Sequence, residues 1–339
     1  MKYLLMVTTM LLSVVLSSCT ASYDDVPVVI YNGEDPYITG FQSKIVKNSE
    51  GKFTVRMYDS QNSQLLQNEL INDLLEQNPK VLVINPVDRL GAYTIIEKAK
   101  AANVPVVFFN REPLEEDLSV WNYAFYVGTF AEGSAIIQSE MVVELFGNAN
   151  NLSDLDKNND GKIQIVLLKG EQGHQDAEKR TTVIIQELER YGYDIELLSL
   201  EVCDWNREIA NEFMLDFIPD HGDSIELVIS NNDAMALGAI DAMKELELFK
   251  DLNEDGFYDM DNDDWIPVIG IDGLTEAIPY LEEGTMYGTV LNDADLQAQA
   301  IIELVDAIIN GEDPNSINFE IIDNNYIWVE YTRFVLDED

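Results

Sequence analysis

The sequence predicts an α/β protein with two lobes, each a parallel sheet flanked by helices. Short apolar runs alternate with segments of helical periodicity along most of the chain, which is typical of parallel sheets covered by helices. The 339 residues suffice for two domains of ordinary size. Hydrophobic residues make up 46% of the chain, so each lobe can bury a core of its own.

The first α/β unit begins at Val26, after the N-terminal segment. Its strands are short apolar runs bounded by polar residues, and its helices carry leucines or isoleucines on one side. In parallel sheets, ligands bind beyond the carboxyl ends of the strands, which directs attention to the polar residues there, such as Asp35, Asn85 and Asn110. We expect strands at 28–31, 53–58, 81–85, 104–109 and 125–129, and helices at 38–48, 63–77 and 92–101.

A second unit of similar size follows, opened by a long helix. The last helix of the series ends at Gly311, a residue typical of helix ends. The two units, with no helix-turn-helix module ahead of them, indicate two lobes around a cleft. We expect helices at 130–146, 176–191, 206–217, 233–246, 274–282 and 293–310, and strands at 163–168, 195–200, 227–230, 268–271 and 288–291.

The N-terminus has the pattern of an export signal. Lys2 provides a short positive region, and residues 3–15 are apolar but too few to span a membrane stably. The following Leu16-Ser-Ser-Cys19 resembles the lipobox of bacterial lipoproteins, in which the cysteine is lipidated after cleavage. We therefore predict a signal peptide at 1–18, lipidation at Cys19 and a tether at 19–25; the alternative is an ordinary cleaved signal with a chance cysteine. An exported protein held to the membrane by lipid alone is expected, because no later run is long and apolar enough to cross.

The net charge of the chain limits the classes of molecule that it can bind. The chain has 20 Lys and Arg residues against 63 Asp and Glu, a formal net charge of −43. Such a charge excludes nucleic-acid binding, which needs a basic surface. It favours solubility and cation binding. Cys203, the one cysteine besides Cys19, is expected to be a packed small residue rather than a nucleophile.

Residues 156–164 have the ligand spacing of a calcium loop. Oxygen-bearing side chains recur at alternating positions before a glycine at the sharp turn, and the Lys162 carbonyl and Gln164 fall at the next two ligand positions. The position where an EF-hand has its bidentate glutamate is Leu167, so that ligand must come from elsewhere. The alternative is a solvated acidic turn. The first three ligand positions are Asp156, Asn158 and Asp160.

The segment after this loop, LLKGEQGHQDAEKRTT at 167–182, resembles the sugar-contacting segment of the periplasmic galactose/glucose-binding proteins, which carry a calcium loop just upstream. The resemblance implies a type I periplasmic-binding-protein fold whose chain passes between the lobes three times. It places the N-terminal lobe at 26–129 plus 293–329 and the C-terminal lobe at 130–292 plus 330–339.

The same resemblance implies the sugar-binding residues. In FFNREP, GHQDAEKR, ISNNDAM, VIGIDG and GTVLND, the residues that match the family's sugar ligands are Asn110, His174, Asp176, Arg180, Asn232, Asp272 and Asn292. Trp205 matches an aromatic that stacks on the sugar ring. Asp35 matches the acid that contacts the 4-hydroxyl and admits both galactose and glucose. Tyr37 stands where the family usually has the second stacking ring, a Phe, so we expect stacking to survive, while the added hydroxyl leaves the fine sugar preference open.

The resemblance also completes the calcium site. It implies that Glu226, just before the strand leading to NNDAM, supplies the missing carboxylate, so that one structural Ca²⁺ is expected. A second run with the same spacing, in a segment that looks like an insertion, predicts a second ion; the alternative is an acidic surface loop. Its candidate ligands are Asp251, Asn253, Asp255 and Asp259, with Asp261, Asp263 or Asp264 to complete the shell.

The function expected from these features is a lipid-anchored solute-binding protein, not an enzyme, that delivers galactose or glucose to an ABC permease as a monomer. One alternative is a sugar sensor that docks on a chemoreceptor or kinase ectodomain, since the sugar site would be the same. Another is a carbohydrate-active enzyme, for which Asp35, Asp176 and Asp272 offer carboxylates. The chain lacks a nucleophile elbow and a phosphate loop. A sugar-responsive repressor is excluded by the charge.

Overall fold

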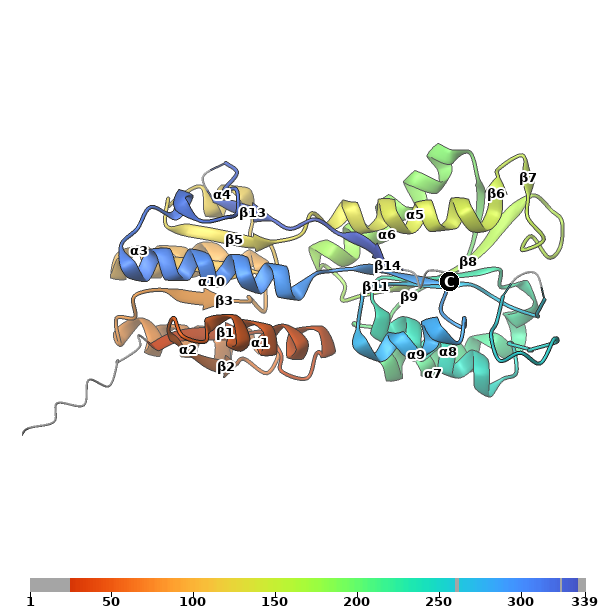
Figure 1. Ribbon diagram of the computed structural model, residues 1–339, viewed down its shortest axis with the longest axis horizontal. Coiled ribbons are helices and arrows are strands. Elements are labelled where there is room, and N and C mark those ends of the chain that lie inside the picture. The colour runs from red at the N-terminus through yellow and green to blue at the C-terminus, as the bar shows by residue number, and fades with distance from the viewer. Residues whose placement is uncertain (1–24, 260–261, 324, 335–339) are drawn as a thin grey trace, which may run out of the picture.

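Two six-stranded sheets organise the chain into two lobes (Figure 1). The structure is a computed structural model that describes residues 25–259, 262–323 and 325–334. The predicted signal peptide, Cys19 and nearly all of the tether lie outside the described residues, as do residues 335–339 of the predicted C-terminal lobe.

The sheet of the first lobe has the order β13-β5-β4-β3-β1-β2, and all of its neighbouring strands are parallel. Apolar side chains of α1 and α10 pack on one face of this sheet, and those of α2 and α3 pack on the other. The short helix α4 precedes β5. The strands are β1 (Asp25–Ile30), β2 (Thr54–Asp59), β3 (Leu82–Ile84), β4 (Val106–Phe109), β5 (Ala124–Gly128) and β13 (Tyr326–Trp328); the helices are α1 (Pro36–Ser49), α2 (Gln64–Glu76), α3 (Ala92–Ala102), α4 (Glu115–Leu118) and α10 (Ala294–Asn310).

The sheet of the second lobe has the order β14-β12-β11-β10-β8-β9 and is parallel except for β14. Helix α5 packs beside α6, and α7 packs beside α8, where Gly238 lets the backbone of α7 approach closely. The strands are β8 (Lys162–Lys169), β9 (Asp194–Val202), β10 (Leu227–Ser230), β11 (Val268–Asp272), β12 (Gly288–Leu291) and β14 (Thr332–Phe334), with a small hairpin of β6 (Gly147–Asn148) and β7 (Asn151–Leu152); the helices are α5 (Ala131–Phe146), α6 (Gln175–Tyr191), α7 (Arg207–His221), α8 (Asp233–Glu245) and α9 (Ile278–Glu282).

Three segments connect the lobes. The chain leaves the first sheet after β5 and enters α5, returns after β12 into α10, and crosses again between β13 and β14 (Figure 1). The carboxyl ends of the parallel strands of both sheets therefore face the junction between the lobes, which is where a ligand site of an open α/β sheet is expected.

The predicted fold class, two helix-flanked and mainly parallel sheets, is confirmed. One detail is wrong: β14 pairs antiparallel with β12, so the second sheet is not wholly parallel. The predicted helix at 274–282 begins as a 3-10 turn, Thr275–Ala277, and continues as α9 with Pro279 in its first turn, where a missing N–H costs no hydrogen bond. The short elements α4, β6, β7, β13 and β14 were not predicted, because segments of two to four residues show no periodicity.

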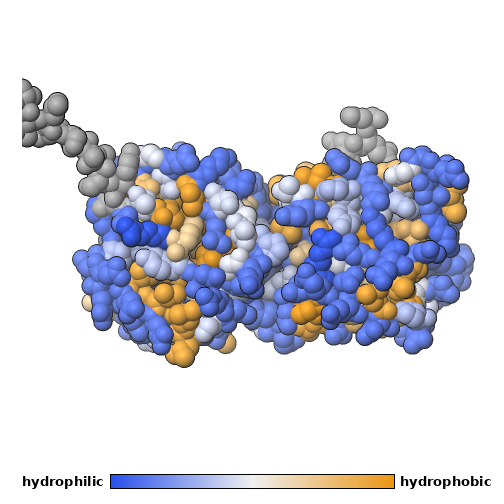
Figure 2. All heavy atoms as spheres, turned by 90° about the horizontal axis from the view of Figure 1, so that it is seen from below, coloured by the Kyte–Doolittle hydropathy of each residue, from blue (hydrophilic) through white to orange (hydrophobic). Residues whose placement is uncertain are grey.

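The surface agrees with the composition. The face shown in Figure 2 is largely hydrophilic on both lobes, with scattered apolar patches. Within residues 25–259, 262–323 and 325–334, no helix is long and apolar enough to cross a membrane.

Candidate functional site

A cavity lies between the lobes, at the carboxyl ends of the strands. It encloses about 360 Å³ not occupied by protein atoms, a volume that includes the part open to solvent. All ten residues that the sequence suggested for a sugar site line this one cavity, together with Tyr31, Ile38 and Arg111. The ten are Asp35, Tyr37, Asn110, His174, Asp176, Arg180, Trp205, Asn232, Asp272 and Asn292.

Helix caps bring several of these side chains to the cavity. Asp35 caps α1, with Oδ1 accepting from the Ile38 N–H at 3.0 Å and Pro36 in the first turn. Asn232 caps α8 through the Met235 N–H at 2.9 Å. His174 caps α6 with its Nδ1, which accepts from the Asp176 N–H at 3.1 Å. Because Nδ1 accepts, the proton of the neutral ring lies on Nε2, which is left as a donor.

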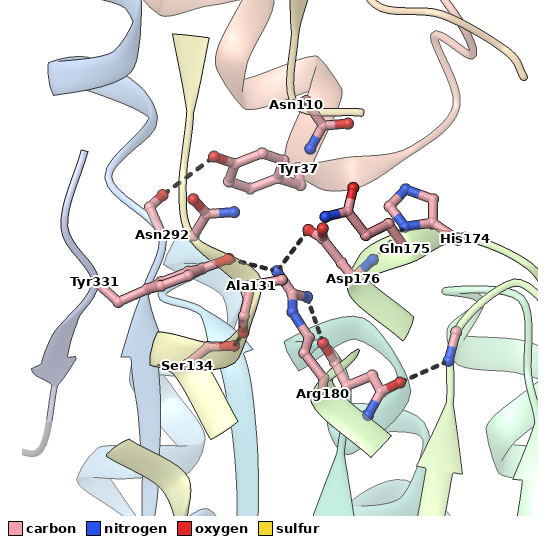
Figure 3. Close-up of polar contacts among 12 residues, drawn as sticks. Tyr37, Asn110, Ala131, Ser134, His174, Gln175, Asp176, Arg180, Asn292 and Tyr331 are labelled. Carbon is pink, nitrogen blue, oxygen red and sulfur yellow. Dashed lines mark hydrogen bonds and ion pairs between the residues drawn. The ribbon is translucent and has the colours of Figure 1, made fainter. Parts of the chain in front are cut away.

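The Arg180 guanidinium is a buried cation of the cavity. It donates to the Asn231 carbonyl at 2.7 Å, to the Tyr331 hydroxyl at 2.8 Å and to Asp176 Oδ2 at 3.2 Å (Figure 3). Only 3% of its surface is exposed. These partners come from the end of β10, the third crossing and the first turn of α6, so the guanidinium is oriented before any ligand arrives.

Trp205 presents an aromatic surface to the cavity. It follows β9 with a positive φ of 64°, and its ring lies over Gly170, where a Cβ atom would meet the indole at 2.3 Å. The His174 ring contacts the indole edge-to-face at a centroid distance of 5.1 Å. The nearby Cys203 is buried, and burial raises the pKa of its thiol to about 12, so the thiol stays protonated and acts as a packing group.

Burial shapes the ionisation of the cavity. It raises the pKa of Asp176 and, more strongly, that of Asp272, while the Arg180 charge opposes both shifts. It lowers the pKa of His174 well below its ordinary value, with the charges of Arg111 and Arg180 acting in the same direction. The imidazole is therefore neutral at neutral pH. The cavity thus combines buried carboxyl groups with a neutral imidazole and a cationic guanidinium, a set suited to hydroxyl groups.

Three contributors were missed from the sequence. The Tyr31 hydroxyl donates to Asp35 Oδ2 at 2.5 Å, and the Arg111 guanidinium stacks on the Tyr31 ring at 3.8 Å from its centroid. Tyr331 orients Arg180 from the third crossing. The FFNREP motif pointed to the region of Arg111, but nothing in the sequence pairs Tyr331 with a residue 151 positions away.

Two side-chain contacts join the lobes at the rim of the cavity. Arg111, after β4, forms an ion pair with Glu171 of the second lobe at 2.7 Å. Gln175 of α6 donates to Glu112 of the first lobe at 2.5 Å. The two lobes therefore meet around the cavity and enclose it.

Asp233 lies behind the cavity floor. It is fully buried and accepts hydrogen bonds from the Thr289 hydroxyl at 2.6 Å and the Leu274 N–H at 2.8 Å. These bonds hold the turn after β11, in which Asp272 has a φ of +127°, a conformation that L-residues rarely adopt. Gly270 permits this close approach, because a Cβ there would meet Asp233 Oδ1 at 2.2 Å. Burial raises the pKa of Asp233 to about 7.

The predicted calcium loop at 156–164 is organised like a metal site. Gly161, with a φ of +79°, donates its N–H to Asp156 Oδ2 at 3.0 Å. Glu226 joins from the start of β10 and accepts from the N–H groups of Lys157 at 2.7 Å and Gln164 at 3.2 Å. Gln164 Oε1 is buried and has no hydrogen-bond partner, which fits an oxygen that coordinates a cation.

The second acidic loop repeats this arrangement. Gly256 donates its N–H to Asp251 Oδ2 at 2.9 Å, as Gly161 does to Asp156. Asp263 accepts from the N–H groups of Leu252 at 2.7 Å and Asp259 at 3.2 Å. These residues are the second and ninth of the loop, so Asp263 takes the place that Glu226 has in the first loop. The Asp251 Oδ1 atom is buried without a partner.

Carboxylates alone do not form a cation site in either loop. In the part of the chain that the structure describes, no three Asp, Glu, His or Cys side chains converge closely enough to hold a metal ion. A bound ion would therefore need amide and backbone oxygens as ligands in addition to carboxylates, and both kinds of oxygen are usual ligands of Ca²⁺.

Comparison with known proteins decides the family. Residues 26–313 match the model described as a periplasmic binding protein domain. The chain is 36% identical over 318 residues to the D-galactose/methyl-galactoside binding periplasmic protein MglB of Haemophilus influenzae, covering 92% of this chain and 90% of that protein. The chain belongs to the periplasmic binding protein family.

Solved structures agree on the fold of this binding protein. One is a periplasmic solute binding protein of an ABC transporter from Actinobacillus succinogenes with bound D-allose, with a TM-score of 0.75, 17% identity and coverage of 92% of this chain and 97% of that one. Another is an ABC transporter solute binding protein from Bacillus halodurans with bound myo-inositol, with a TM-score of 0.74, 23% identity and coverage of 94% and 96%. The resemblance noted in the sequence is confirmed, and so is the expectation of a transport-type binding protein rather than an enzyme.

Replacing Asp233 by Asn is expected to change the pH dependence of stability. An unfolded aspartate has a pKa of about 3.9, whereas that of Asp233 is about 7 in the fold. Between these values the folded chain binds more protons than the unfolded chain, so Asp233 makes the free energy of unfolding fall as pH rises from about 4 to about 7, after which its effect is constant. Urea unfolding across this range should show a smaller loss in the Asp233→Asn variant. Parallel curves for the two proteins would contradict the assignment.

Proposed function

We propose that this chain is a lipid-anchored, exported binding protein that takes up D-galactose or D-glucose in the interlobe cavity and delivers it to an ABC-type importer. The observation that carries the proposal is the convergence of all ten family-matched side chains on one cavity. The relative from Haemophilus influenzae, named as a D-galactose/methyl-galactoside binding protein, supports the choice of hexose. The lipobox pattern ending at Cys19 supports the anchor.

The chemistry of the cavity supports a pyranose ligand. Sugar hydroxyls pair with planar groups that donate and accept, and the C–H faces of the ring pack on flat aromatic surfaces. Carboxylates, amides and the Arg180 guanidinium supply the first, and Trp205 and Tyr37 supply the second. Hydrogen bonds to charged groups contribute about 1.5–3 kcal/mol each, enough in combination for roughly micromolar binding after the entropic cost of association.

The two loops support calcium binding in the second lobe. In the first loop, Gln164 Oε1 and the Lys162 carbonyl would join the carboxylates of Asp156, Asp160 and Glu226, with Asn158 as the remaining side-chain ligand. In the second loop, Asp263 would provide the carboxylate that Glu226 provides in the first. The ions would neutralise acidic side chains and stiffen the lobe, and neither loop lines the sugar cavity.

Asp176→Ala, Arg180→Ala and Trp205→Ala should each weaken binding of galactose and glucose at least about tenfold, a loss of roughly 1.4 kcal/mol. The first two remove charged hydrogen-bonding groups and the third removes the stacking surface. Titration calorimetry measures the effect, with ribose and xylose as reference sugars.

The matched control is Arg190→Ala on the exposed side of the same helix as Arg180, which should bind as wild type. Removing one partner of the buried Asp176–Arg180 pair costs about 3–5 kcal/mol, so Gly170→Ala serves as an independent variant. It keeps both charges and displaces the Trp205 indole. Unchanged affinity in Gly170→Ala and in the three alanine variants at Asp176, Arg180 and Trp205 would rule out this sugar site.

Calcium is expected to bind at two ions per chain and to raise the melting temperature. A ligand at about 100 times its Kd stabilises the folded state by about 2.7 kcal/mol. Gln164→Ala and Asp263→Ala should each reduce the ion count by one, whereas Asp264→Ala, whose carboxylate bonds to Lys250, should leave it unchanged. Metal analysis of protein dialysed against calcium gives the count. If the wild-type protein binds one ion, the second loop is not a calcium site. If it binds none, neither loop is.

A further inference from the structure

The hydroxyl group of Tyr37 is directed away from the ligand space. It donates to the Asn292 carbonyl at 3.3 Å and accepts from Gln297 Nε2 at 3.1 Å. Figure 3 shows it pointing toward Asn292, on the opposite side from Asn110 and His174. The ring packs edge-to-face on Phe41 at a centroid distance of 5.8 Å, which fixes its plane. The sequence left open how the extra hydroxyl affects the sugar preference; the structure gives this hydroxyl protein partners.

The same Gln297 amide also holds the side chain of Asn292. Its Nε2 donates to Asn292 Oδ1 at 2.7 Å as well as to the Tyr37 hydroxyl. Both hydrogens of this amide are thus used, so Gln297 cannot rotate without losing both bonds. Tyr37, Gln297 and Asn292 are all buried, with exposed fractions of 8%, 1% and 4%, and water cannot easily replace a lost partner.

This arrangement selects one orientation of the Asn292 amide. Because Oδ1 accepts from Gln297, the NH₂ group turns the other way, toward the Asp272 side chain, whose pKa Asn292 helps to lower. The NH₂ group therefore faces the ligand cavity as a donor. Asn292 directly follows β12 at the second crossing, Gln297 lies in α10 and Tyr37 in α1, so the orientation is set from the first lobe.

We propose that Tyr37 is a positioning residue for sugar binding, whose hydroxyl, through Gln297, fixes Asn292 as a hydrogen-bond donor to the ligand. The inference rests on the proposed function of the cavity. The phenol ring and the phenol hydroxyl of Tyr37 then have separate roles. The ring lies against the ligand, and the hydroxyl orients the Asn292 amide that binds the ligand.

Tyr37→Phe tests the proposal, because it keeps the ring and removes only the hydroxyl. Without the hydroxyl, Gln297 loses one acceptor and both amides can rotate, so the Asn292 donor is no longer fixed. Affinity for galactose and glucose should fall about fivefold, in the range of one lost neutral hydrogen bond. In an Asn292→Ala background the same Tyr37→Phe change should cause no further loss, since no amide remains to be oriented.

Tyr193→Phe is the matched control. Tyr193 is also a buried tyrosine, and its hydroxyl donates to a backbone carbonyl, that of Gly147, but it does not line the cavity. This variant should bind sugar as wild type. The proposal is overturned if Tyr37→Phe leaves the affinity unchanged, or if it weakens binding by the same factor with and without Asn292, which would indicate a role of the ring or the fold.

A measurement without sugar separates this inference from the proposed function. In asparagine-labelled protein, the side-chain amide resonances of Asn292, identified by their loss in Asn292→Ala, should shift in Tyr37→Phe and not in Tyr193→Phe. If wild-type protein binds none of the hexoses, the proposed function fails whatever the resonances show. If hexoses bind to wild-type protein and the Tyr37→Phe variant binds them with the same affinity, only the positioning role fails.

Discussion

The buried guanidinium of Arg180 is the interaction on which the cavity depends. It is held by Asp176 from its own helix, by the Asn231 carbonyl from the end of β10 and by Tyr331 from the third crossing. A buried ion pair contributes little net stability, because desolvation of the charges offsets their attraction, whereas removing one partner is strongly destabilising. The pair is therefore better explained by position than by stability, since it presents a charged donor and a charged acceptor to the same small space.

Other polar side chains of the cavity are also held in position by hydrogen bonds to the protein, but without burying a further ion pair. Asp35, His174 and Asn232 each satisfy a helix N-terminus with one side-chain atom, and His174 keeps its Nε2 as a donor for a ligand. The parallel strands of both sheets end at one junction, and helices begin close after several of them. Side chains that cap these helices therefore lie next to the cavity. Three of the side chains that line the cavity are thus helix caps.

Much of this could be predicted from sequence, and the limits have physical causes. The helix-flanked sheets follow from periodicity, and the ten cavity residues follow from the resemblance of their motifs to those of the galactose/glucose-binding family. Tyr331 and Arg111 could not be assigned, because their roles depend on partners in distant segments: Tyr331 meets Arg180 only through the third crossing, and Arg111 meets Glu171 only across the lobes. The role of the Tyr37 hydroxyl also depends on a residue 260 positions away, Gln297.

The side-chain contacts between the lobes at the rim of the cavity affect how strongly a ligand must favour the closed arrangement. The Arg111–Glu171 pair joins the lobes directly, but the Glu171 side chain is 39% exposed, and a pair with one exposed partner contributes about 1 kcal/mol at most. Such a contact favours the closed arrangement too weakly to maintain it. A ligand that contacts Asn110 and Tyr37 on one lobe and Arg180 and Trp205 on the other gains all of its contacts only when the lobes meet. It therefore binds the closed form preferentially and shifts the population toward it by that difference in affinity.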